Sequence, residues 1–71
     1  MDEADRELLQ GMGNCYDACG EDFENTVRMV GRARGLTPEE VKGRLATIKE
    51  ESGETAEYRE LRARLPEEFP L

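Results

Sequence analysis

Apolar residues recur every three or four positions along much of this 71-residue chain, which is the spacing that lines up one face of an α-helix. The first such stripe predicts a helix over residues 2–19, and its acidic first turn suits the positive end of the helix dipole. Glycines at positions 11 and 13 favour a bend in this helix, and Gly20 favours its end in a left-handed cap. The inward residues of the stripe are Leu8, Leu9, Met12, Cys15, Tyr16 and Cys19.

Two more helices are predicted around residues 23–34 and 38–51. Gly35 is a natural C-terminal cap for the first of them. The second begins after Thr37 with a proline at the first helical position and Glu40 at the third, which is the sequence of a capping box. The inward residues are Phe23, Val27, Met29, Val30 and Ala33 in the first helix and Val41, Leu45 and Ile48 in the second.

A fourth, shorter helix is predicted after Thr55, and Pro66 ends it. Residues 66–71 then form a short extended tail, in which Phe69 and Leu71 are expected to fold back onto the helices. The inward residues of the fourth helix are Tyr58, Leu61 and Leu65.

The chain has no run of strand-like alternation and no internal repeat. The predicted fold class is therefore all-α: a single helical domain over residues 1–71, built as a compact bundle of three to four short helices. Chains this short bury only about 60% of the surface that their unfolded forms expose, so the core is small. A second subunit or another partner is a common way to supplement such a core.

Composition narrows the chemistry. The chain has no histidine, which removes the usual general base near neutral pH and the commonest metal ligand. No activated nucleophile, carboxylate pair or glycine-rich phosphate loop stands out, so we expect no catalytic residues, no enzyme activity and no cofactor. The acidic N-terminus does not resemble a secretory signal, and no apolar run has the length of a membrane span. We therefore expect a cytoplasmic protein.

Charge is unevenly distributed in this acidic chain of net charge −7. Residues 1–26 contain eight acids and one arginine, and residues 50–71 contain seven acids and three basic residues. Residues 27–49 contain six basic residues and two acids. One interpretation is internal pairing of this basic hairpin with the acidic ends of the chain, and the other is an anion-binding surface. The basic residues are Arg28, Arg32, Arg34, Lys42, Arg44 and Lys49.

The segment 27–45 resembles the DNA-binding helix-turn-helix, with Gly35 in the turn and the small residue Gly31 four positions earlier. The apolar residues at positions 30, 36 and 41 also fit that pattern. Arg44 departs from it, since the motif usually has an apolar residue there, and the acidic composition is atypical of DNA-binding proteins. The resemblance implies these DNA contacts: Arg28, Arg32, Thr37, Lys42 and Lys49.

Cys15 and Cys19 are spaced for one helical face, where free cysteines behave as small core hydrophobes. Two cysteines supply half of the ligands that a zinc or iron–sulfur site needs, so a metal site would have to form across a dimer. A redox-dependent disulfide between two copies is a further alternative.

These patterns favour a small acidic protein-interaction or regulatory module without catalytic activity, with self-association or another protein as its partner. A helix-turn-helix DNA-binding regulator is the alternative, and a cysteine-based metal or redox sensor is the third possibility.

Overall fold

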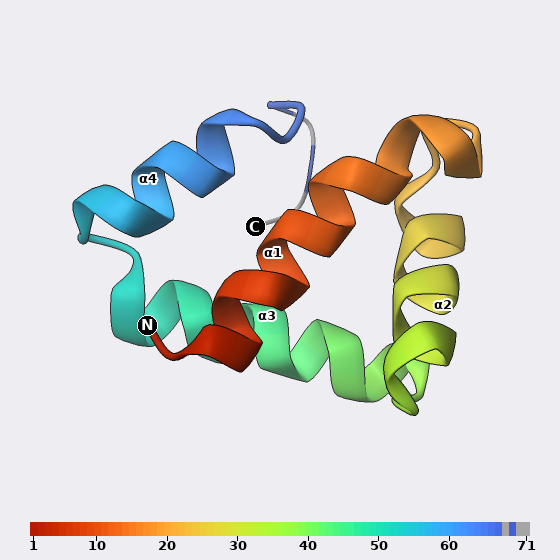
Figure 1. The fold of residues 1–71 in the computed structure, drawn as a ribbon, viewed down its shortest axis with the longest axis horizontal. Coiled ribbons are helices and arrows are strands. Elements are labelled where there is room, and N and C mark those ends of the chain that lie inside the picture. Colours follow the sequence, from red (N-terminus) through yellow and green to blue (C-terminus); the bar gives the residue numbers. More distant parts are fainter. Residues whose placement is uncertain (68, 70–71) are drawn as a thin grey trace.

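Four α-helices and one 3₁₀ turn make up the described part of the chain, residues 1–67 and 69, in the computed structural model (Figure 1). This arrangement confirms the all-α bundle and the helix-turn-helix-like hairpin. None of these helices has the length and hydropathy of a membrane span. The elements are α1 (Glu3–Tyr16), the 3₁₀ turn (Asp17–Cys19), α2 (Phe23–Arg34), α3 (Pro38–Ser52) and α4 (Ala56–Ala63).

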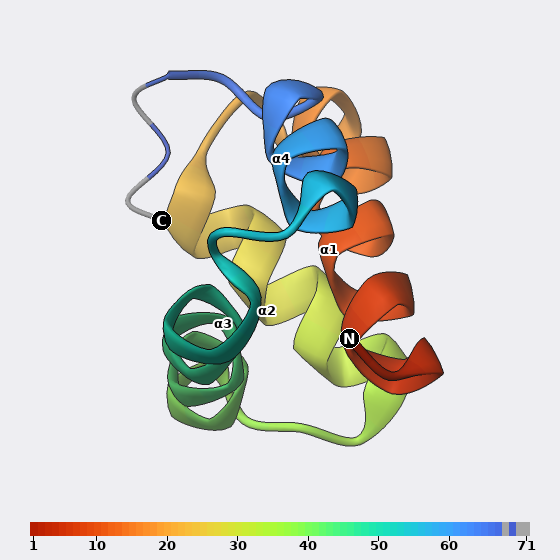
Figure 2. The same cartoon turned by 90° about the vertical axis from the view of Figure 1, so that its left-hand side faces the viewer.

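Helix α1 is the central element, because it contacts α2, α3 and α4. Figure 1 shows it running diagonally between α2 and α4, with α3 along one side, and Figure 2 shows α3 almost along its axis. The residues where these helices meet form one core: Leu8, Leu9, Met12, Val27, Val30, Val41, Leu45, Ile48, Tyr58, Leu61, Leu65 and Phe69.

Every α-helix begins at a side chain that accepts a hydrogen bond from the backbone of its first turn; these caps are Asp2, Asp22, Thr37 and Thr55. The cap of α3 is a complete capping box. The backbone N–H of Glu40 donates to Thr37 Oγ1 at 3.2 Å, and the backbone N–H of Thr37 donates to Glu40 Oε1 at 2.9 Å. The predicted starts of α3 and α4 are thus confirmed.

The turn between α2 and α3 depends on two glycines. Gly35 ends α2 with φ +70°, a left-handed conformation that glycine adopts without steric cost. Gly31 is buried where the two helices meet, and a Cβ there would lie 2.7 Å from the carbonyl oxygen of Leu36 and 3.0 Å from Val41 Cγ2. The absence of a side chain at Gly31 therefore allows α3 to approach α2 this closely.

The first helix differs from its prediction at both the glycines and the end. Helix α1 is continuous through Gly11 and Gly13, and a Cβ at Gly11 would lie 3.2 Å from Arg34 Nη2. The α-helix ends at Tyr16, after which a 3₁₀ turn leads to Gly20 in the predicted left-handed conformation (φ +74°). The glycine at position 11 thus leaves room for Arg34, whose Nη2 donates to the carbonyl oxygen of Glu7 at 2.9 Å.

The predicted inward face of α2 is wrong at two positions. Met29 is 46% exposed and Ala33 is also exposed. The predicted inward positions of Val27 and Val30 are confirmed, and the buried arc of α2 extends from them to Thr26 and Gly31 instead of to Met29 and Ala33. The hydroxyl of Thr26 donates to the carbonyl oxygen of Asp22 at 2.7 Å. This hydrogen bond allows a polar residue to be buried at a position where the apolar pattern does not predict one.

The tail folds back as predicted for Phe69, which is only 3% exposed; Leu71 lies outside the described residues. The ring centroid of Phe69 is 4.7 Å from that of Tyr16 and 5.1 Å from that of Phe23. Arg62 holds this segment through its guanidinium, which donates to the backbone carbonyl oxygens of Leu65, Pro66, Glu67 and Phe69 at 3.0–3.4 Å.

Candidate functional site

A groove with a volume of about 700 Å³ lies between the start of α2 and the outer side of α3. We call it the α2–α3 groove. Its lining is apolar in the middle and charged at the edges, and it consists of Phe23, Glu24, Lys42, Leu45, Ala46, Lys49 and Glu50.

The groove follows from the way α3 presents its residues. Leu45 points into the core and is 1% exposed, so it forms the floor. Lys42, Ala46 and Lys49 lie on the neighbouring strip of α3, since residues three and four apart in a helix share a face. Phe23, the first residue of α2, forms the opposite wall, and its edge-on contact with Phe69 holds the ring there.

The two lysines of the groove differ in their partners. Lys42 Nζ lies 2.8 Å from Glu24 Oε1, and this hydrogen bond raises the pKa of Lys42 above its ordinary value. The side chain of Lys49 is exposed and has no hydrogen bond or ion pair with the described residues, and the same holds for the side chain of the adjacent Glu50. One lysine and one glutamate therefore stay uncompensated at the α3 edge of the groove.

The structure supports internal pairing with acids of the described chain for two of the six basic residues of the hairpin. Besides the pair between Lys42 and Glu24, Arg44 Nη1 lies 3.7 Å from Asp5 Oδ1 on α1. The guanidinium of Arg34 donates instead to the backbone carbonyl oxygen of Glu7 on α1. These contacts tie α2 and α3 to the acidic segments of the chain.

The predicted DNA contacts are only partly brought together. Lys42 and Lys49 line the same groove, whereas Arg28, Arg32 and Thr37 do not. Arg28 donates to the side chain of Asn25 on its own helix. The hydroxyl oxygen of Thr37 is used in the capping box of α3.

Both cysteines are free thiols. Cys15 is half-buried against the core, and Cys19 lies in the 3₁₀ turn and is 8% exposed. Their burial fits the core interpretation. In the described part of the chain no three His, Cys, Asp or Glu side chains are grouped closely enough to hold a metal ion.

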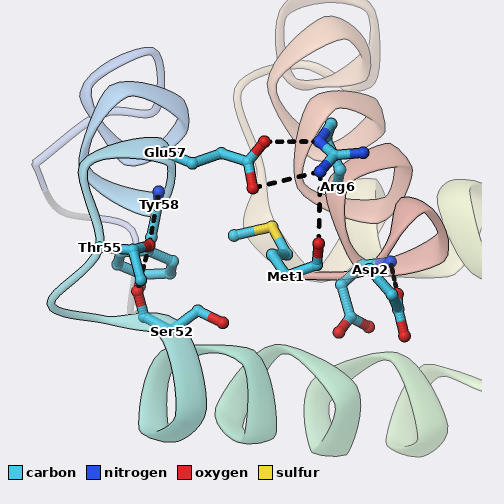
Figure 3. A network of polar contacts seen from close by, with 8 residues as sticks. Met1, Asp2, Arg6, Ser52, Thr55, Glu57 and Tyr58 are labelled. Carbon is cyan, nitrogen blue, oxygen red and sulfur yellow. Dashed lines mark hydrogen bonds and ion pairs between the residues drawn. The ribbon is translucent and has the colours of Figure 1, made fainter.

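A polar cluster that the sequence did not indicate joins α1 to α4 (Figure 3). Arg6 Nε donates to Glu57 Oε2 at 2.7 Å, and its Nη2 donates to Glu57 Oε1 and to the carbonyl oxygen of Met1, both at 3.3 Å. The hydrogen bond from Arg6 lowers the pKa of Glu57 below its ordinary value. Nearby Tyr58 is buried, which raises its pKa, and its hydroxyl has no hydrogen-bond partner among the described residues. This cluster links the start of α1 to the first turn of α4.

The groove escaped sequence reasoning because it depends on where the start of α2 meets α3. Lys42 and Lys49 are seven residues apart in the sequence and could have been placed on one face of the helix. Phe23, which forms the opposite wall of the groove, lies on another helix, and no periodic pattern in the sequence links Phe23 to the two lysines. The sequence matches no protein-family model, no curated protein and no solved structure.

Proposed function

We propose that this protein is a small helical protein-interaction module, without catalytic activity of its own, that docks part of another protein chain in the α2–α3 groove. The observation that carries the proposal is the apolar part of the groove lining, in which the described residues leave Ala46 exposed and Phe23 half-buried above the floor formed by Leu45. Grooves of this kind, between helices, accommodate the apolar face of an amphipathic segment. The charged edges then set the orientation of the bound segment.

The size of the chain also supports this proposal. A domain of 71 residues has a small core, so apolar surface that a partner covers adds to its stability. Met29, which is 46% exposed on α2, provides further adaptable apolar surface outside the groove.

The proposal is tested with a substitution that fills the groove. In Ala46→Arg a long charged side chain takes the place of the small exposed alanine that lines it. Ala63→Arg is the matched control, because Ala63 is exposed at the end of α4, away from the groove residues. Immobilised wild type and both variants are exposed to the same cell extract, and bound proteins are quantified by mass spectrometry. We expect a set of proteins bound by wild type and by Ala63→Arg but not by Ala46→Arg. Equal binding by all three would show that no protein of the extract docks in the groove.

DNA binding through the hairpin is the second candidate, and the observation that favours it is the turn geometry at Gly31 and Gly35. Lys49 would then contact a phosphate. The test is a titration of duplex DNA at low salt with the wild type and with Lys49→Glu. DNA binding by the wild type, weakened in Lys49→Glu, would favour this candidate. Because Glu24 already neutralises Lys42 and the chain carries a net charge of −7, we expect no binding.

A further inference from the structure

We infer that the α2–α3 groove is occupied by a second copy of this chain, related by a two-fold axis, with the two α3 helices crossing in antiparallel orientation between Ala46 and Glu50. This inference rests on the proposed function and names its partner. It follows from the charges at the groove edge, the shape of α3 and the distribution of charge over the whole chain.

The charges at the groove edge are self-complementary. Lys42 and Glu24 neutralise each other, which leaves Lys49 and Glu50 as adjacent charges of opposite sign without partners among the described residues. In a two-fold interface, if residue i contacts residue j of the other copy, then j also contacts i. Lys49 of each copy can therefore pair with Glu50 of the other, so one contact geometry satisfies four charges.

The shape of α3 suits a close crossing of two helices. Ala46 is small and exposed at the groove, and Gly43 lies one turn before it on the solvent side of the helix. A Cβ at Gly43 would meet nothing within 4 Å, so nothing in the described chain requires a glycine there. A glycine inside a helix is nevertheless unfavourable relative to alanine. Small residues on an exposed helix face allow a neighbouring helix to approach, and the groove beside α3 receives that helix.

The distribution of charge makes this face the favourable one for two like-charged molecules. The chain carries −7 overall, but its acidic residues are concentrated in residues 1–26 and 50–71. Residues 27–49, which form most of α2 and nearly all of α3, carry an excess of basic residues. The lining of the α2–α3 groove holds two acids, Glu24 and Glu50, and two lysines, Lys42 and Lys49. Contact through this groove therefore joins surfaces without net charge and leaves most of the acidic residues outside the interface.

The available surface is sufficient. Stable interfaces bury on the order of 1,200–2,000 Å² in total, which is about 600–1,000 Å² on each partner. The chain has an accessible surface of 4549 Å². One side of a molecule of this size can supply the required area, and α3 alone contributes a helix of 15 residues.

Association is measured by sedimentation equilibrium under reducing conditions, which exclude a disulfide-linked dimer. We expect a reversible dimer for wild type and for Ala63→Arg, and a monomer for Ala46→Arg. Lys49→Glu and Glu50→Lys each replace two attractive pairs with two repulsive ones, so each should raise the dimer dissociation constant about tenfold. The double variant Lys49→Glu/Glu50→Lys restores opposite charges and should return close to the wild-type value.

Arg59→Glu is the charge control, since Arg59 is exposed on α4, has no partner among the described residues and changes the net charge as Lys49→Glu does. At 0.1 M salt, where repulsion between the two whole molecules is screened beyond about 10 Å, it should change the dissociation constant far less than Lys49→Glu does. Monomeric wild type at millimolar concentration, or a double variant as weak as the single ones, would overturn the second-copy inference. Loss of captured proteins in Ala46→Arg, with wild type monomeric, would leave the proposed function standing with a different partner.

Discussion

At the scale of single residues, Gly31 and Gly43 have different roles although both lie inside helices. Gly31 is enclosed by the carbonyl oxygen of Leu36 and by Val41, whereas Gly43 has open space around it. Gly31→Ala forces α2 and α3 apart and should lower the free energy of unfolding by about 1–3 kcal/mol. Gly43→Ala should raise it by about 0.5–1 kcal/mol, because alanine loses less backbone freedom on folding.

Urea unfolding of both variants at low protein concentration, where the chain is monomeric, measures this difference. A stabilising effect of Gly31→Ala would show that the two helices separate without cost, and it would remove the close approach at the turn as a determinant of the fold.

Tyr58 leads to a second prediction at this scale. Its hydroxyl is buried without a hydrogen-bond partner in the described part of the chain, and a buried polar group in that state is unfavourable. Tyr58→Phe keeps the ring in the core and removes the hydroxyl, so the free energy of unfolding should increase by about 1 kcal/mol. A decrease in the same urea titration would indicate that an ordered water satisfies the hydroxyl in solution.

At the scale of elements, the capping box makes the stability of α3 depend on pH. The backbone hydrogen bond from Thr37 lowers the pKa of Glu40 below its ordinary value of 4.5. Because the pKa is lower in the folded state, the stabilising contribution is fully present above pH 4.5 and is lost as the pH falls through the folded-state value. Glu40→Gln keeps a side chain that can accept this hydrogen bond without titrating.

Free energies of unfolding measured between pH 7 and pH 3 should therefore depend less on pH in Glu40→Gln than in wild type. Glu57, whose pKa is also lowered, titrates in both proteins and leaves a residual slope. Equal slopes for the two proteins would contradict a role of the Glu40 carboxylate in the cap.

The tail also behaves as an element, because Arg62 and Phe69 attach it to three helices. Phe69→Ala removes a buried aromatic ring and should cost about 3–5 kcal/mol, which is close to the whole stability of a domain of this size. Arg62→Gln keeps the ring but removes the guanidinium that holds the carbonyl oxygens, and it should cost less. Circular dichroism during thermal unfolding distinguishes the two, and equal melting temperatures would contradict this account.

The elements predicted correctly are those with strong local signals. Thr37 and Glu40 define the start of α3 by hydrogen bonds within a few residues, and Gly35 defines the end of α2 by its own conformation. Periodicity identifies Val27 and Val30 as inward but does not fix the limits of the buried arc of α2, so it predicts a buried Met29, whereas the buried arc carries Thr26. The groove and the tail contacts join residues far apart in sequence, where local patterns carry no information.

At the scale of the whole molecule, the net charge of −7 predicts how association responds to salt. Two copies repel each other over a distance set by ionic strength, about 30 Å at 0.01 M and about 10 Å at 0.1 M salt. Pairs between Lys49 and Glu50 at a crossing of helices are short-range and partly shielded from solvent, so salt weakens them less. The dimer should therefore tighten when salt is raised over this range, as measured by sedimentation. Weaker association at higher salt would instead indicate that attraction between charges dominates.

The position of Phe69 has a consequence for synthesis. Its ring closes the space between Tyr16 and Phe23, yet the ribosome delivers it only after all four helices have been made. Until the ring of Phe69 has been synthesised, it cannot cover Tyr16 and Phe23 in the nascent chain. Chaperones and other nascent chains can contact these two side chains during that time. Completion of the core therefore follows translation of the helices rather than accompanying it.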